Sequence, residues 1–121
     1  MTAAVWAGVL ILGGLGAVLR FLVDREVSRR LADGFPFGIL IVNVTGAWLL
    51  GFLSSLALGP HVALLAGTAF VGSYTTFSTW MLHTMRLGEE RKPWPAVANI
   101  VVSLILGLAA AWFGQWIGLQ L

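Results

Sequence analysis

The chain has 121 residues, of which 59% are hydrophobic and only 10% are charged. Soluble domains carry about 25% charged residues, so the composition excludes an ordinary soluble domain and indicates an integral membrane protein. The net charge of +2 rests on only seven Lys and Arg residues, which favours charge flanking a membrane over nucleic-acid binding. The chain has no cysteine, which excludes disulfides and thiol chemistry.

Four segments are long and apolar enough to cross a membrane, since a transmembrane helix needs about 20 such residues. We expect these spans at about 4–23, 37–58, 62–87 and 95–119. We expect polar loops at 24–34 and 88–95, and a short Gly-Pro-His turn at 59–61, to separate them. No basic residue precedes the first apolar run, so we expect a retained span and no cleaved signal peptide. The sequence therefore predicts an all-α membrane protein with one four-span domain over residues 1–121.

All seven basic residues lie on one side of this predicted arrangement. They are Arg20, Arg25, Arg29, Arg30, Arg86, Arg91 and Lys92. The two termini and the 59–61 turn lie on the other side, which carries no Lys or Arg. The positive-inside rule then places both charged segments in the cytoplasm and both termini outside. We expect a multi-pass protein of the plasma membrane, of bacterial type.

Small and polar residues recur every four positions along the second and fourth spans. The stripes are Asn43, Ala47, Gly51 and Ser55 in the second span, and Asn99, Ser103, Gly107 and Ala111 in the fourth, with Gly114 and Gly118 beyond. Such stripes let membrane helices approach closely, and Asn and Ser can hydrogen-bond across them. Helix packing and a polar pathway both explain the pattern. Four short helices enclose little space, so a pathway would need a second subunit.

The third span contains the stretch GSYTTFSTW at 72–80, in which five of nine residues are Ser or Thr. Hydrocarbon tolerates so many hydrogen-bonding groups only where they face protein, water or an ion. Gly72 and the β-branched pair Thr75 and Thr76 are also poor helix formers. We therefore expect the third helix to be broken near Gly72–Thr76, at the functional centre of the protein.

The predicted spans contain no Asp or Glu, which argues against proton-coupled cation export. The sequence also offers no nucleophile with a base in reach, no metal-ligand spacing and no phosphate-binding loop, so we predict that it is not an enzyme. What remains are donors such as Asn43 and Ser103, and aromatic rings with positive edges. This set suits a small anion. Arg20 at the membrane boundary either raises the local anion concentration or simply snorkels to the interface.

Three segments resemble the Fluc family of fluoride channels, and the resemblance extends over nearly the whole chain. They are GGLGAVLRF at 13–21, FGILIVNVTG at 37–46 and GSYTTFSTW at 72–80. The run Thr-Thr-Phe-Ser-Thr in mid-span is the most specific of them. The resemblance implies a fluoride-selective channel that lets fluoride leave the cytoplasm passively. It also implies a dimer of antiparallel subunits with two narrow fluoride pathways built from both chains.

The resemblance further implies roles for single residues. A structural sodium ion, which is not transported, would lie at the dimer centre on the backbone carbonyls of Gly72 and Thr75. Arg20 would lie in the vestibule of the path. The fluoride pathway itself would involve Asn43, Phe77, Ser78, Thr79, Trp80 and Ser103.

Three positions depart from the family pattern. Trp80 stands where a second phenylalanine is usual, Ser73 replaces a common glycine, and Phe21 replaces a common tyrosine. A tryptophan still presents a ring edge and adds an N–H donor, but its size would narrow or reshape the path.

Two other functions stay open from the sequence. A small four-span drug or cation transporter has a similar length, but it requires an acidic residue in the first span, and residues 1–23 contain none. The other is a non-conducting partner subunit of a heterodimeric channel. An antiparallel homodimer requires one chain to insert in both orientations, which a bias of seven basic residues to none disfavours. The second subunit is therefore either the same chain or a homologue of opposite bias.

Overall fold

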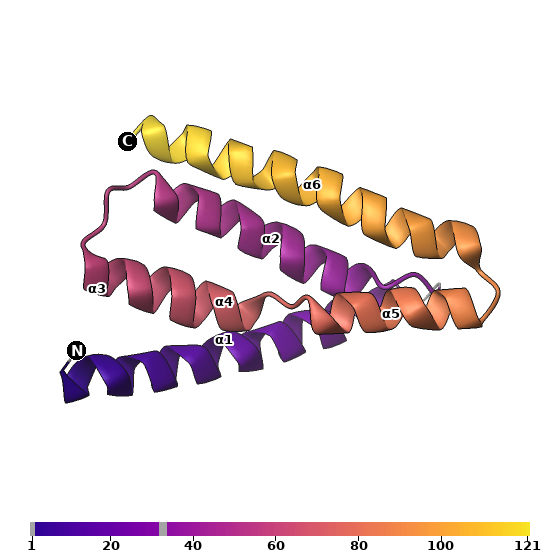
Figure 1. The fold of residues 1–121 in the computed structure, drawn as a ribbon, viewed down its shortest axis with the longest axis horizontal. Helices are drawn as coiled ribbons and strands as arrows, with labels where there is room; N and C mark the ends of the chain where they lie inside the picture. The colour runs from indigo at the N-terminus through magenta and orange to yellow at the C-terminus, as the bar shows by residue number, and fades with distance from the viewer. Residues whose placement is uncertain (1, 32–33) are drawn as a thin grey trace.

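The computed structural model describes residues 2–31 and 34–121, and every regular element in these two ranges is helical. Three elements, α3, the π-helix η1 and α4, follow one another without a gap, and α5 continues their path. Together they form the third of four helical rods, and helices α1, α2 and α6 are the other three (Figure 1). This confirms the predicted all-α fold. The elements are α1 (Ala3–Arg30), α2 (Phe37–Ser54), α3 (Pro60–Ala63), η1 (Leu64–Val71), α4 (Gly72–Tyr74), α5 (Ser78–Glu89) and α6 (Pro93–Leu119).

Helices α1, α2 and α6 are each long and apolar enough to span a membrane. The third predicted span, 62–87, is instead divided among short helical pieces. The protein is therefore a multi-pass membrane protein in which one of four rods is interrupted.

Helix α1 is longer than the predicted first span. It begins after Thr2, whose hydroxyl accepts a hydrogen bond from the Val5 amide at 3.3 Å. It continues to Arg30, so the predicted polar loop at 24–34 was wrong for residues 24–30. Glu26 pairs with Arg29 and Arg30, each at 2.7 Å, and such pairs three and four residues apart support a helix outside the membrane. Asp33, which the predicted loop included, lies outside the described residues.

The turns also differ from prediction by a few residues. Helix α2 ends at Ser54, not at 58, and Ala57 adopts a left-handed conformation with φ 46°. The following rod begins at Pro60 because proline fits the first helical turn, where its missing N–H is not needed. Helix α6 likewise begins at Pro93, two residues before the predicted start, directly after Arg91 with φ 58° and Lys92.

The rods are held together by glycines at their crossings. Helix α2 packs along α6, and α1 crosses both α2 and the third rod (Figure 1). A Cβ on Gly51 would collide with the carbonyl of Ala111, and a Cβ on Gly114 with that of Trp48. On α1, a Cβ on Gly16 would collide with the Phe70 carbonyl. These glycines let backbones touch, which is how membrane helices gain packing energy.

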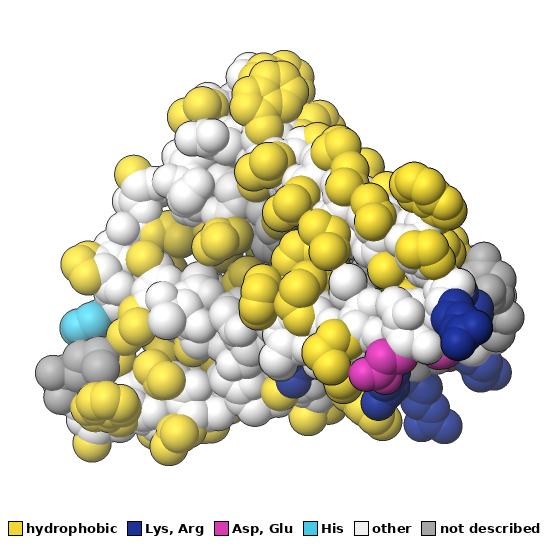
Figure 2. Space-filling view, turned by 45° about the vertical axis from the view of Figure 1, so that its right-hand side comes forward, with side chains coloured by type: hydrophobic (Ala, Val, Ile, Leu, Met, Phe, Trp, Pro, Cys, Tyr) yellow, Lys and Arg dark blue, Asp and Glu magenta, His cyan; other side chains and the backbone are white. Residues whose placement is uncertain are grey.

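The charged side chains gather at one end of the molecule, as Figure 2 shows. This is the end with the α1–α2 and α5–α6 connections, whereas both termini and the α2–α3 turn lie at the other end (Figure 1). The structure thus separates a charged end from a nearly uncharged one, in the arrangement from which the cytoplasmic side was predicted.

Candidate functional site

The third rod is broken between α4 and α5. Helix α4 ends at Tyr74, Thr75 has an extended backbone (φ −82°, ψ 163°), and α5 begins at Ser78. The break predicted near Gly72–Thr76 is therefore confirmed, and its position is sharpened. Gly72 is still helical (φ −60°, ψ −36°), and the chain leaves the helix three residues later, at Thr75.

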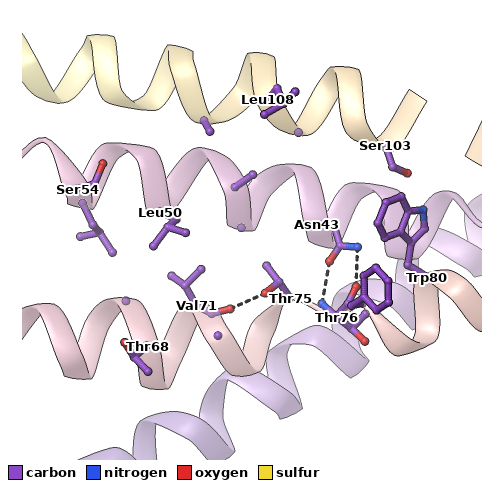
Figure 3. A pocket seen from close by; sticks show the side chains of 18 of the residues that line it. Asn43, Leu50, Ser54, Thr68, Val71, Thr75, Thr76, Trp80, Ser103 and Leu108 are labelled. Atoms are coloured by element: carbon purple, nitrogen blue, oxygen red, sulfur yellow. Dashed lines mark hydrogen bonds between the residues drawn. The ribbon is translucent and has the colours of Figure 1, made fainter. Parts of the chain in front are cut away.

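Asn43 of α2 holds this break by a paired hydrogen bond. Its Nδ2 donates to the Thr76 carbonyl at 2.9 Å, and its Oδ1 accepts from the Thr76 amide at 2.9 Å (Figure 3). The Thr76 hydroxyl then accepts from the Thr79 amide at 3.2 Å, which satisfies one of the free N–H groups at the start of α5. Two side chains thus replace the backbone bonds that the break removes.

The same two side chains leave two backbone carbonyls free. In an unbroken helix, Gly72 O would accept from the Thr76 amide and Thr75 O from the Thr79 amide. Both amides are instead bound by Asn43 and by the Thr76 hydroxyl. Within the described part of the chain, no hydrogen bond reaches either carbonyl oxygen. Unpaired carbonyls away from water are rare, and they are the natural ligands of a hard cation.

A partly open groove of about 810 Å³ lies beside the break. Residues of α2, η1 and α6 line it. Most of its surface is apolar, from residues such as Leu104 and Leu108 of α6. Its polar and aromatic end is shown in Figure 3. This end is lined by Asn43, Gly72, Thr75, Thr76, Phe77, Trp80 and Ser103.

Two aromatic rings stand at this end of the groove. The Phe77 and Trp80 rings meet edge to face, with centroids 5.7 Å apart and planes at 84°. Phe77 is 70% exposed, so most of its surface is left uncovered by its own subunit. The indole N–H of Trp80 donates to the Asn99 carbonyl of α6 at 3.0 Å. The N–H donor that Trp80 adds in place of phenylalanine is thus used in a bond between α5 and α6.

The other predicted pathway residues are placed differently. The Ser103 hydroxyl lines the groove, is buried and has no hydrogen-bond partner among the described residues. Ser78 is exposed and the Thr79 hydroxyl contacts Thr76 at 3.3 Å, and neither residue lines the groove. Arg20 lies on α1, half-buried and away from the groove. The structure thus brings together Asn43, Phe77, Trp80 and Ser103 with both predicted carbonyl positions.

A family model described as CrcB-like protein, Camphor Resistance (CrcB), matches residues 7–115. The chain belongs to the CrcB-like family. A relative from Mycobacterium tuberculosis, named Fluoride-specific ion channel FluC 2, is 68% identical over 97% of this chain and 93% of its own. Two relatives named Fluoride-specific ion channel FluC 1 are more distant. The one from Leifsonia xyli is 41% identical over 98% of this chain and 89% of its own, and the one from Streptomyces avermitilis is 40% identical over 92% and 93%.

Three residues of this CrcB-like chain matter at the site in ways that the sequence did not predict, although Thr76 was expected at the break as a poor helix former. Thr76 supplies the cap of α5, and Asn99 and Thr84 join α5 to α6. Asn99 did carry a signal, since it begins the stripe of the fourth span. Nothing in its spacing identified Trp80 as its partner.

Proposed function

We propose that this chain is a subunit of a fluoride-selective channel, not an enzyme, and that it lets fluoride leave the cytoplasm passively. The observation that carries the proposal is its 68% identity, over nearly its full length, to a chain named as a fluoride-specific ion channel. A negative cell interior drives a trapped anion outward by about 2.3 kcal/mol per charge for each 100 mV. Such a channel lowers intracellular fluoride without any energy source of its own.

The chemistry of the groove supports an anion as its occupant. The described residues that line it include no Asp or Glu to repel an anion. Phe77 and Trp80 supply ring edges, and Ser103 supplies a hydroxyl without a partner in the described chain. Asn43 uses one of its two N–H groups in the hydrogen bond to the Thr76 carbonyl, which leaves the second as a donor for an anion. A small, strongly hydrated anion needs several such partners at once. We assign the fluoride path in the groove to these residues. Ser78, Thr79 and Arg20 do not line the groove, so they would belong to the path only outside it, Ser78 and Thr79 on α5 and Arg20 in a vestibule.

A second, antiparallel subunit would close the groove. One subunit leaves it open on one side, with large apolar side chains exposed around it, Phe77 by 70%, Leu104 by 50% and Leu108 by 72%. The partner is either a second copy or a homologue of opposite charge bias. The charge concentrated at one end favours the homologue, since it gives this chain a single preferred orientation. The two numbered names of the relatives, FluC 1 and FluC 2, agree with paired chains.

The free carbonyls of Gly72 and Thr75 fit a structural sodium ion at the dimer centre. The described residues contain no cluster of His, Asp or Glu that could hold a metal, so backbone oxygens would be the ligands. Such an ion would satisfy the two oxygens. Its charge would also lower the cost of bringing an anion into a low-dielectric site.

A liposome efflux assay tests the proposed function. The purified chain, alone and together with a homologue of opposite bias, is reconstituted with internal fluoride or chloride, and release is started with a potassium ionophore. We expect rapid release at a fluoride electrode and far slower release at a chloride electrode. Release by the single chain makes it a self-sufficient channel, and release only by the mixture makes it one half of a heterodimer. No fluoride release in either case, or equal release of chloride, would falsify the proposal.

A further inference from the structure

Residues 80 and 99 join α5 to α6 by reciprocal hydrogen bonds. The Trp80 indole donates to the Asn99 carbonyl at 3.0 Å, and the Asn99 amide Nδ2 donates to the Trp80 carbonyl at 3.4 Å. The same Nδ2 donates to the Thr84 hydroxyl at 2.9 Å, and that hydroxyl donates to the Trp80 carbonyl at 3.0 Å. Side chain and backbone of Trp80 are therefore both tied to α6. We call Trp80, Thr84 and Asn99 the α5–α6 clamp.

The Asn99 side chain is almost completely buried between α6 and α5. It is 1% exposed and is the buried polar side chain among the described residues of this subunit. A buried amide is costly unless its donors are satisfied, and a membrane interior offers no water to do so. Both N–H groups of Asn99 find acceptors on α5. The position of the first turn of α5 relative to α6 is therefore tightly constrained.

This constraint reaches the groove through one ring. Trp80 lines the groove and meets the Phe77 ring at 5.7 Å, whereas Asn99 and Thr84 do not line it. Phe77 directly follows Thr76, whose backbone is fixed by Asn43. The ring pair is thus held from two sides, by α2 through the break and by α6 through the clamp.

We propose that Asn99 is a positioning residue of the anion path: its backbone carbonyl binds the Trp80 indole, and its side chain fixes the α5 backbone that carries this ring, without touching the ion. The inference rests on the proposed function and adds a residue that determines selectivity. If the first turn of α5 shifts, the edge-to-face arrangement with Phe77 is lost, and the two ring edges no longer line the groove at a fixed spacing that selects an anion by size. Loss of the clamp therefore lowers both the fluoride rate and the ratio of fluoride to chloride release.

The test compares Asn99→Leu with wild type at equal amounts of dimeric protein. Leucine keeps the volume and removes both side-chain donors to α5, whereas the carbonyl of residue 99 remains, so the Trp80 ring moves only because the first turn of α5 is no longer fixed. We expect fluoride release to fall about tenfold, as for the loss of one to two buried hydrogen bonds, and the fluoride-to-chloride ratio to fall with it. Tyr74→Phe is the matched control, since it removes the buried bond of Tyr74 to the Thr45 hydroxyl (2.8 Å), which does not involve α5. This control should keep the wild-type ratio.

A double-mutant cycle with Trp80→Phe supplies a readout that a merely structural role would not give. Phenylalanine lacks the indole N–H, so this variant has already lost the hydrogen bond from residue 80 to the Asn99 carbonyl. If the clamp acts as one unit, the double variant keeps a fluoride-to-chloride ratio within about twofold of the worse single variant. Ratios that multiply as independent effects would overturn the proposal.

Two further outcomes distinguish failure of the positioning role from failure of the proposed function. If wild-type protein releases no fluoride, the proposed function fails. If wild type conducts and Asn99→Leu keeps its rate and ratio, only the positioning role fails. Should Asn99→Leu not fold, Thr84→Val removes one acceptor of the Asn99 amide with little change in shape, and it should lower the ratio about threefold. A wild-type ratio in folded Thr84→Val would then reject the inference.

Discussion

Two stretches of α2 illustrate different ways to hold a membrane protein together. Toward its C-terminal end, α2 meets α6 through glycines, with Gly51 against Ala111 and Gly114 against Trp48. Toward its N-terminal half, it meets the third rod through hydrogen bonds, of which the Asn43–Thr76 pair is the centre. Lipid tails are as apolar as the helix surfaces, so the hydrophobic effect does not drive helices together in a membrane. Close van der Waals contact is therefore needed where no hydrogen bonds join two helices. Side-chain hydrogen bonds are needed where the backbone is broken.

The largest effect should come from a methyl group in the glycine contact. Gly114→Ala places a Cβ against the Trp48 backbone carbonyl, which cannot move aside as a flexible side chain would. We expect overpacking of about 3 kcal/mol or more and little folded protein. Size-exclusion chromatography and thermal unfolding in detergent measure this directly.

Gly107→Ala is the matched control on the same helix. A Cβ at Gly107 would meet no atom within 4 Å, and the residue lines the groove instead. The variant should fold with wild-type yield. Equal loss of folded protein in both variants would mean that the small-residue stripe acts through something other than this contact.

The second effect belongs to the groove and not to the fold. Phe77 is 70% exposed in the subunit, so Phe77→Ile removes a ring edge from the anion path with little loss of packing. We expect fluoride release to fall about tenfold or more, corresponding to roughly 1.4 kcal/mol, while the dimer forms normally. Failure of the dimer to assemble would instead assign Phe77 to subunit packing.

The sequence predicted the break because Gly72, Thr75 and Thr76 are poor helix formers in a span that is otherwise apolar. It did not identify which partners stabilise the break, since Asn43 is 33 residues from Thr76 and that contact depends on how α2 packs. Local propensity is visible in a sequence, whereas a partner at that distance is set by tertiary packing.

The small-residue stripes show the same limit. Their spacing indicated a face on each helix but not how that face is used. In the structure Gly114 packs against α2, while Gly107 of the same stripe lies open in the groove. The polar segment after the first span was also misjudged, because Glu26 and its two arginines stabilise a helix there by local ion pairs.

A third effect, read as a shift in unfolding temperature, tests the link between the break and the proposed sodium ion. Asn43→Leu leaves the Thr76 N–H and C=O without their partner, at a cost of about 2 kcal/mol. The Thr76 amide then becomes available to the Gly72 carbonyl, which it would bind in a regular helix. We expect wild type to unfold at a higher temperature in sodium chloride than in N-methylglucamine chloride, and the variant to lose that difference.

Thr45→Val is the control for this experiment. It also alters a hydrogen bond of α2 to the third rod, that of Thr45 with Tyr74, but leaves both proposed sodium ligands as they are. Its unfolding temperature should still depend on sodium. If Asn43→Leu keeps the full sodium dependence, the carbonyls freed by Asn43 are not the ligands.

The smallest effect should come from Thr76→Val, which removes the hydroxyl that caps α5 and keeps the side-chain shape. The two hydrogen bonds to Asn43 remain, because they involve only the Thr76 backbone. A lost cap costs about 1 kcal/mol, so the unfolding temperature should fall by only a few degrees. The Thr79 amide is then free to bind the Thr75 carbonyl, one of the two proposed sodium ligands. Sodium dependence should therefore weaken without disappearing, because the Gly72 carbonyl stays free. A complete loss, equal to that in Asn43→Leu, would mean that the break is held mainly by its own cap and not by α2.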